Sequence, residues 1–156
     1  MASLTELRAA GYTEREVRRA LRAGELMPVR RGIYAVRGVP DEPMVRHAMS
    51  VRAAERGVAS EAVISHVSAA ALHGLPSWGV ALDRVHVTRS RRNGGRVDRV
   101  LHLHVAHLAP DEIVIIDGIA VTSVARTVVD CARLLGFEQA LVIADAALHM
   151  RKVETG

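Results

Sequence analysis

Residues 13 to 36, TEREVRRALRAGELMPVRRGIYAV, constrain the fold more than any other part of the chain. At 3.6 residues per turn, the first half of this segment forms a helix with two unlike faces. The basic face carries Arg15, Arg18, Arg19 and Arg22, and the apolar face carries Val17, Ala20 and Leu21. Thr13 and Glu16 have the spacing of a capping box, and Gly24 is placed to end the helix. We therefore predict a helix that packs on a core with one side and presents guanidinium groups on the other.

Two short strand-like runs follow this helix, at residues 26–29 and 33–36. Between them lies the basic turn Arg30-Arg31-Gly32, in which the glycine permits a positive φ. A basic helix followed by a basic-tipped hairpin is typical of a winged helix-turn-helix. In that module one helix enters the DNA major groove, and the wing reaches the backbone or a minor groove.

A first helix for this pair is predicted from Ser3 to Ala10, where Ser3 and Glu6 form another capping box. A winged helix-turn-helix normally has one more helix before the pair, and only two residues remain here. Either a later helix supplies the missing packing, or the head is a reduced version. The helix predicted from Met44 to Arg56 is one candidate, and it fits a second domain equally well.

Charge is distributed unevenly along the chain. The formal net charge is +4, and residues 1–40 hold eight arginines and four acidic residues. The remainder has equal numbers of basic and acidic residues, so the whole excess lies in the N-terminal segment. A basic head on a neutral body indicates that only the head meets a polyanion. Aromatic residues make up 3% of the chain, which argues against a single-strand or RNA platform built on base stacking.

The remaining patterns predict an α+β protein, with a winged helix-turn-helix at residues 1–38 and a mixed domain at residues 44–150. The mixed domain should hold an antiparallel sheet followed by C-terminal helices. The expected strands cover residues 84–88, 100–106, 112–117 and 119–123. The expected helices cover residues 68–73, with Ser68 as the cap, then residues 123–135 and 137–150. The last helix is apolar enough to be either buried or a partner surface.

A basic loop, SRRNGGRVDR, connects the first two strands of that sheet. It is either a solvated hairpin tip or a second phosphate-contact site, and the sequence favours neither. The candidate residues for this second DNA contact are Arg89, Arg91, Arg92 and Arg96.

Histidines recur in two places. His66 and His73 lie seven residues apart, and His102 and His104 share one face of a strand, with His86 on the neighbouring one. No cysteine or carboxylate completes a ligand set near either group. We therefore expect hydrogen-bonded or solvated histidines and no metal site.

The cysteine content and the apolar runs of the sequence bear on redox state and localisation. The single cysteine, Cys131, excludes an internal disulfide and fits a reducing cytoplasm. The start of the chain has no hydrophobic run of the signal-peptide kind, and no apolar run reaches membrane-spanning length. Cys131 falls on the apolar side of a predicted helix, so we expect it in the core.

The order of these pieces resembles the AbiEi family of antitoxins, from type IV toxin–antitoxin systems. The matching stretches are LRAAGYTEREVRRALRAGELMPVRRGIYAV, ISHVSAAALHGLP, VHVT, DGIAVTSVARTVVDCAR and DAALH. The resemblance implies a DNA-binding head that represses its own operon at inverted repeats, as a homodimer or as cooperative monomers. It also implies a C-terminal domain that counteracts a nucleotidyltransferase-type toxin.

Two other function classes remain open. The chain resembles the DNA-targeting front of endonuclease-related proteins, whose catalytic domain would here be absent, and it could also bind only a protein partner. A restriction-type nuclease needs a carboxylate cluster with a Glu-x-Lys, yet the only lysine is Lys152 in the tail. A Ser65-His66-Asp130 assembly has no nucleophile elbow to support it. We therefore expect no enzyme, no catalytic residue and no cofactor.

The six arginines of the head have different expected roles. The N-terminal part of a recognition helix lies deepest in the groove, so we assign Arg15 and Arg18, with Arg19 as a further candidate, to base edges. Arg22 is assigned to phosphate. Arg30 and Arg31, at the wing tip, are assigned to phosphate or a narrow minor groove.

Overall fold

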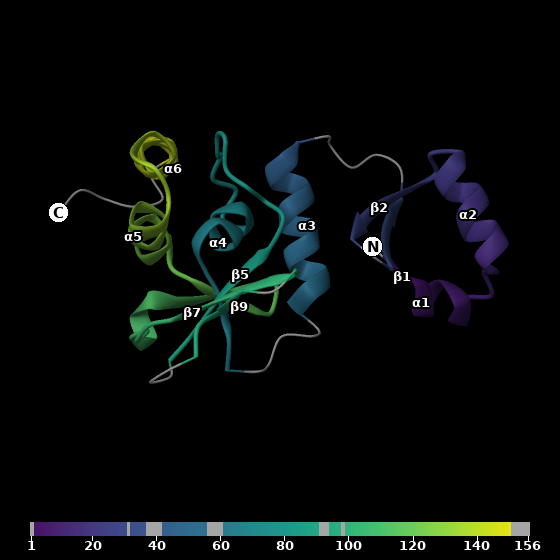
Figure 1. The fold of residues 1–156 in the computed structure, drawn as a ribbon, viewed down its shortest axis with the longest axis horizontal. Coiled ribbons are helices and arrows are strands. Elements are labelled where there is room, and N and C mark those ends of the chain that lie inside the picture. The colour runs from purple at the N-terminus through teal and green to yellow at the C-terminus, as the bar shows by residue number, and fades with distance from the viewer. Residues whose placement is uncertain are drawn as a thin grey trace.

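The computed structural model describes residues 2–30, 32–36, 42–55, 61–90, 94–97 and 99–150. Within this part the chain forms six α-helices and two β-sheets, so the predicted α+β class is confirmed. Figure 1 shows a small N-terminal unit on one side of α3 and the larger sheet with its helices on the other. None of the described helices has the length and apolar character needed to cross a bilayer.

The N-terminal unit is a helix pair followed by a hairpin that joins a three-stranded sheet. Its elements are β1 (Ala2–Ser3), α1 (Leu4–Ala9), α2 (Glu14–Arg22), β2 (Leu26–Arg30) and β3 (Ile33–Val36). The strand order is β1-β3-β2, and both pairings are antiparallel. The predicted helix pair and hairpin are therefore present, and β1 is a third strand that the sequence patterns did not predict.

Both helices begin at the predicted capping boxes. The backbone N–H of Ser3 donates to Glu6 Oε2 over 2.8 Å, and the backbone N–H of Thr13 donates to Glu16 Oε2 over 2.8 Å. Each cap satisfies amide donors that the first turn of a helix leaves free. Beyond α2, Gly24 has φ +69°, a left-handed conformation that glycine adopts without steric cost.

The larger unit contains a six-stranded sheet and four helices. Its helices are α3 (Pro43–Glu55), α4 (His66–Leu72), α5 (Val124–Leu134) and α6 (Phe137–His149), with a 3-10 turn at Pro110–Glu112. Its strands are β4 (Val63–Ile64), β5 (Val85–Arg89), β6 (Arg96–Val97), β7 (Leu101–Val105), β8 (Ile113–Ile116) and β9 (Ile119–Thr122). The helices gather on one side of the sheet (Figure 1).

The sheet is mixed, with strand order β6-β7-β5-β4-β9-β8. We expected antiparallel strands, and three of the neighbouring pairs are antiparallel, but β4 pairs with β9 and β5 pairs with β7 in parallel. The basic loop after β5 is therefore not a hairpin tip between β5 and β7. The chain instead returns along β6, which forms its antiparallel pair with β7.

The core lies between the sheet and the helices. Fully buried residues from each layer meet there, including Val51, Val67, Val121, Cys131 and Ile143. The predicted core position of Cys131 is confirmed. Burial also raises the pKa of its thiol to about 12, with a further contribution from Asp130, so the group stays protonated and inert.

Helix α3, whose role the sequence left open, packs with the larger unit and also contacts the smaller one. Met44, Ala48 and Val51 are buried in the main core. On the side that meets the hairpin, Ser50 Oγ donates to the carbonyl oxygen of Val29 in β2 over 3.2 Å. The helix therefore forms the junction between the two sheets.

The predicted cap at Ser68 is wrong. Helix α4 begins at His66 with Ser65 as its N-cap residue, and Ser68 lies inside the helix. Its Oγ accepts a hydrogen bond from the backbone N–H of His86 over 2.9 Å. The hydroxyl thus ties α4 to β5, a long-range contact that takes precedence over the local capping preference of serine.

Candidate nucleic-acid interface

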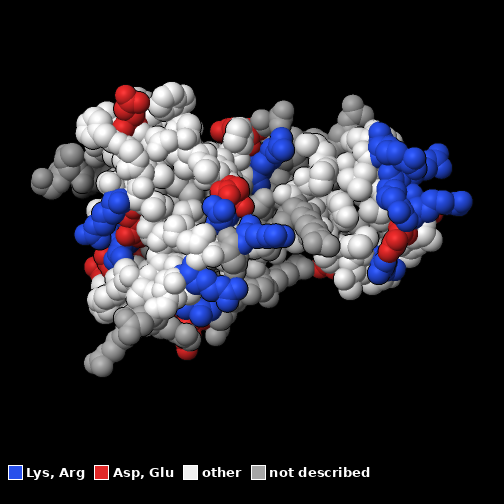
Figure 2. Space-filling view, viewed as in Figure 1, with Lys and Arg blue, Asp and Glu red and all other residues white. Residues whose placement is uncertain are grey.

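Helix α2 has the two faces that its sequence predicts. Val17 is 2% exposed, while Ala20 and Leu21 are half-buried against the rest of the N-terminal unit. The exposed residues of the opposite face include Arg15, Arg18, Arg19 and Arg22. Figure 2 shows basic side chains gathered at the end of the molecule where α2 lies. A basic surface of this kind suits a polyanion.

An acidic residue that sequence reasoning missed lies within this basic face. Glu14 forms ion pairs with Arg8 and with Arg18, the latter over 3.4 Å. The i, i+4 spacing of Glu14 and Arg18 was the signal that could have revealed it. Exposed pairs of this kind contribute little to stability and are screened by salt, so they leave both arginines able to change partner.

The remaining arginines of α2 differ in their local partners. The guanidinium groups of Arg15 and Arg19 form no ion pair with any residue that the structure describes. Arg22 Nε donates to the carbonyl oxygen of Arg18 over 3.4 Å. Arg15 and Arg19, whose side chains have neither an ion pair nor a hydrogen bond to a described residue, are therefore the ones most available to an incoming phosphate or base.

A second acid, Glu16, is fixed at the start of α2. Its carboxylate accepts hydrogen bonds from the Thr13 hydroxyl and from the Thr13 backbone N–H, and these bonds lower its pKa. Arg15 lowers the pKa further through its charge. Glu16 therefore stays ionised, and its negative charge interacts favourably with the positive, N-terminal end of the α2 helix dipole.

The hairpin places its basic turn at the end of β2. Arg30 is the last residue of β2 and pairs in register with Ile33, while Gly32 has φ +78° in the turn. Arg31 lies outside the described residues. Pro28 fits within β2 because this strand is at the edge of its sheet, where a missing N–H breaks no ladder.

The second group of arginines belongs to the larger sheet, on the far side of α3 from α2 (Figure 1). Arg89 ends β5, and its Nε is buried with no hydrogen-bond partner among the described residues. Arg96 is exposed in β6. Arg91 and Arg92 lie outside the described residues. Within the described residues, the structure does not join Arg89 or Arg96 to the basic face of α2.

The predicted pair between Arg126 and Asp130 is present and largely buried, with 2.9 Å between Arg126 Nε and Asp130 Oδ1. Arg126 Nη1 also contacts Glu112 Oε2 over 2.7 Å and the carbonyl oxygen of His107 over 3.0 Å. One guanidinium thus joins α5 to the segment before β8. This network therefore stabilises the larger unit, which contains both α5 and β8.

The residues of the imagined catalytic triad are not arranged as one. Ser65 Oγ does lie 2.9 Å from His66 Nδ1, but Ser65 is fully buried. Asp130 Oδ1 is occupied by Arg126, and Oδ2 has no hydrogen-bond partner in the described part of the chain. No contact from Asp130 therefore orients the imidazole, as a triad requires.

The N-terminal unit, with its capped helix pair and basic face, coincides with a region that matches a known family. Residues 1–37 match the AbiEi antitoxin family of transcriptional regulators. This AbiEi segment contains β1, α1, α2, β2 and β3, and it ends before α3. The match covers less than a quarter of the chain and supports a DNA-binding transcriptional regulator of the antitoxin class. No curated protein matches the chain.

Proposed function

We propose that the protein is a DNA-binding antitoxin that represses its own operon, with residues 1–38 as a winged helix-turn-helix and residues 44–150 as a second domain. The observation that carries this proposal is the row of exposed arginines on α2, opposite a buried Val17, inside the AbiEi segment. An α-helix that presents such a face fits the major groove of B-DNA, which is roughly 12 Å wide.

Within the proposed head, α2 is the recognition helix and the β2–β3 hairpin is the wing. The turn between α1 and α2 is short, as in other helix-turn-helix pairs. Strand β1 anchors the start of the pair to the wing, because Ala2 pairs with Tyr34 and the N–H of Leu4 donates to the carbonyl oxygen of Gly32. This anchor supports the orientation of α1.

The arginines divide between two kinds of contact. Arg15, Arg18 and Arg19 read base edges, where a guanidinium fork matches guanine N7 and O6. Arg22 contacts phosphate, and Arg30 and Arg31 contact phosphate or a narrow minor groove from the wing. Arg18 must break its ion pair with Glu14 to contact DNA. Because that pair is exposed, breaking it requires little free energy.

An operator with inverted repeats requires two copies of the head, so the protein acts as a homodimer or as cooperative monomers. The larger unit offers an apolar surface for a second copy or for a nucleotidyltransferase-type toxin. On α6, Phe137 is 81% exposed, and Leu141 and Leu148 are exposed as well, while Ile143 and Ala147 fill the core. We place the protein in the cytoplasm, with a type IV toxin–antitoxin operon as its target and no catalytic role.

Fluorescence anisotropy with the promoter DNA of its own operon and with random DNA tests this proposal at several salt concentrations. The Arg15→Ala/Arg19→Ala variant should lose operator binding by at least tenfold, because two unpaired guanidinium groups are removed. Arg133→Ala is the matched control, since Arg133 is also an exposed helical arginine but lies on α5.

Equal binding by the parent and the double variant would overturn the assignment of α2. Cleavage of plasmid DNA by the pure protein with magnesium would overturn the non-enzymatic part of the proposal. For the antitoxin role, growth of cells that express the neighbouring toxin gene should depend on co-expression of this chain.

A further inference from the structure

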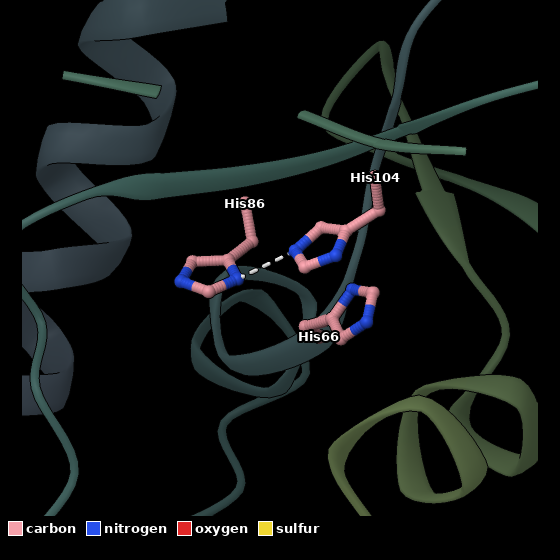
Figure 3. Close-up of side chains that lie close together, drawn as sticks. All are labelled: His66, His86 and His104. Carbon is pink, nitrogen blue, oxygen red and sulfur yellow. Dashed lines mark hydrogen bonds between the residues drawn. The ribbon is translucent and has the colours of Figure 1, made fainter. Parts of the chain in front are cut away.

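Three histidines from separate segments converge beside the larger sheet (Figure 3). His86 lies in β5, His104 lies in β7, and His66 is the first residue of α4. The parallel register pairs His86 with His102 and Thr88 with His104, so the side chains of His86 and His104 emerge on the same face. The start of α4 then brings His66 over that face.

The ring nitrogens of the three histidines are close enough to share one ion. His86 Nδ1 and His104 Nε2 lie 3.0 Å apart, and the ring of His66 stacks on that of His104 with 3.7 Å between centroids. One nitrogen from each residue lies within 4.8 Å of the other two. Two nitrogen ligands of a tetrahedral zinc ion, each at about 2.0–2.1 Å, lie roughly 3.3 Å apart, so the 3.0 Å contact is close to a ligand pair.

All three imidazoles are held in the form that binds metals. Burial, followed by mutual repulsion among the histidines, lowers the pKa of His66 and of His86 to about 3. The same causes lower the pKa of His104 to about 4. An uncharged imidazole has one nitrogen lone pair to offer a metal ion, and the geometry described above brings three such nitrogens together.

The surroundings hold the ring of His66 and the backbone of His86 in place. His66 has φ +52°, a left-handed conformation that non-glycine residues adopt only when neighbouring contacts enforce it. Ser65 Oγ lies 2.9 Å from His66 Nδ1 and itself accepts a hydrogen bond from Thr88 Oγ1 over 2.7 Å. Ser68 Oγ accepts from the backbone N–H of His86. Hydroxyl groups behind a histidine ligand commonly orient the ring and select its tautomer.

We propose that His66, His86 and His104 bind a divalent transition-metal ion, with Zn²⁺ as the best fit to an all-imidazole set. Three protein ligands leave one position of a tetrahedral ion to water. His102 stacks on the ring of His104 with 4.0 Å between centroids, next to the proposed ligands. The ion joins the start of α4 to both strands, so binding stabilises the larger unit.

His73 does not belong to this site, although the sequence pairs it with His66. Its Nε2 donates to the carbonyl oxygen of Thr122 over 2.8 Å, at the other end of α4. The sequence spacing of His66 and His73 therefore gives no ligand pair, and the true partners of His66 come from the sheet.

Calorimetric titration of the tag-free, metal-stripped full-length protein with ZnCl₂ tests the proposal. We expect one ion per chain. His104→Ala and His66→Ala should each weaken binding about 100-fold or more, since a ligand is lost. His149→Ala is the control, because His149 is an exposed histidine at the end of α6, and it should bind zinc as the parent does.

Cobalt substitution supplies a measurement that needs no variant. Co²⁺ added to the parent should give the intense visible bands of a tetrahedral nitrogen site, and Zn²⁺ should abolish them by displacement. An octahedral cobalt spectrum, an absence of zinc binding, or unchanged zinc affinity in folded His104→Ala and His66→Ala proteins would each overturn the proposal. Circular dichroism confirms that the variants are folded.

Discussion

Glu14 and Arg18 form an ion pair one turn apart on α2, with 3.4 Å between Glu14 Oε2 and Arg18 Nη2. The same carboxylate group also pairs with Arg8 from α1. A negative charge therefore lies within the surface that we propose contacts DNA, and it competes with phosphate for two of the arginines.

Replacing Glu14 by Gln should raise the affinity for operator and random DNA alike. The variant frees Arg8 and Arg18, and pairs of this exposure contribute up to about 1 kcal/mol, which corresponds to roughly fivefold in affinity. Anisotropy at low and moderate salt measures the gain, which should shrink as salt rises. Glu138→Gln, an exposed acid in the first turn of α6, is the control. A weaker complex for Glu14→Gln would contradict the proposed placement of α2.

Arg18→Ala should weaken operator binding by about 1–3 kcal/mol while changing random-sequence binding much less. A base-reading guanidinium contributes mainly where its guanine is present. Competition with operators mutated one position at a time should also reveal a single position at which discrimination relaxes. Unchanged affinity for the operator would show that Arg18 does not read a base.

Arg31→Ala should behave differently, because a wing-tip arginine on phosphate contributes without regard to sequence. We expect operator and random DNA to lose affinity together, and the slope of log K against log salt to fall by about one unit. Salt titrations of both DNAs measure this slope. If only operator binding weakens, the wing carries sequence information and the phosphate assignment is wrong.

Removing one partner of the buried pair in α5 should destabilise the protein strongly. Arg126→Met leaves the carboxylate of Asp130 buried without a counter-charge, and we expect a loss of about 3–5 kcal/mol in the free energy of unfolding. The double variant Arg126→Met/Asp130→Leu should recover part of that loss. Urea unfolding of the parent, the single variant and the double variant measures both quantities, and equal stability of the parent and Arg126→Met would contradict the prediction.

Acid should destabilise the fold through His47. Burial lowers the pKa of this imidazole from its ordinary 6.5, although the carbonyl oxygen of Leu82 and the charge of Asp83 act in the opposite direction. The unfolded chain therefore takes up a proton at a higher pH than the folded protein does. The stability that this group contributes is complete above about pH 6.5 and is lost as the pH falls below it.

Urea unfolding between pH 8 and pH 5 tests this assignment. His47→Gln should lose less stability on acidification than the parent, because the other buried histidines still titrate but His47 no longer does. His149→Gln, at an exposed position, should follow the parent. Identical pH profiles for the parent and His47→Gln would remove His47 as a source of acid sensitivity.

The sequence predicted the N-terminal unit well because its signals are local. Ser3 with Glu6 and Thr13 with Glu16 determine where two helices begin, and each pair lies within four residues. The apolar face of α2 follows from helical periodicity alone. Strand β1 was not predicted because two residues are too few to show the alternation of a strand. Only their pairing with β3 defines the strand.

The sheet and the histidine site depend on contacts that no local pattern specifies. The two-residue strand β4 lies at the centre of the larger sheet and makes the parallel pair with β9. The approach of His66 to His86 and His104 requires the parallel register of β5 and β7 and a left-handed backbone at His66. The sequence analysis grouped His66 with His73 and His86 with His102 and His104, and expected no metal site in either group. It gave no sign that His66 approaches the sheet, and the fold separates His66 from His73.

Helix α3 contacts both units, so a movement of this helix would be transmitted from one unit to the other. Met44 and Val51 fix the helix in the larger core, while Ser50 holds the carbonyl of Val29 on the strand that leads to the wing. A toxin or second copy that displaced α3 would therefore tilt the hairpin as well. If residues 1–38 bind DNA as we propose, a partner bound to the larger unit would then alter DNA binding through the position of α3.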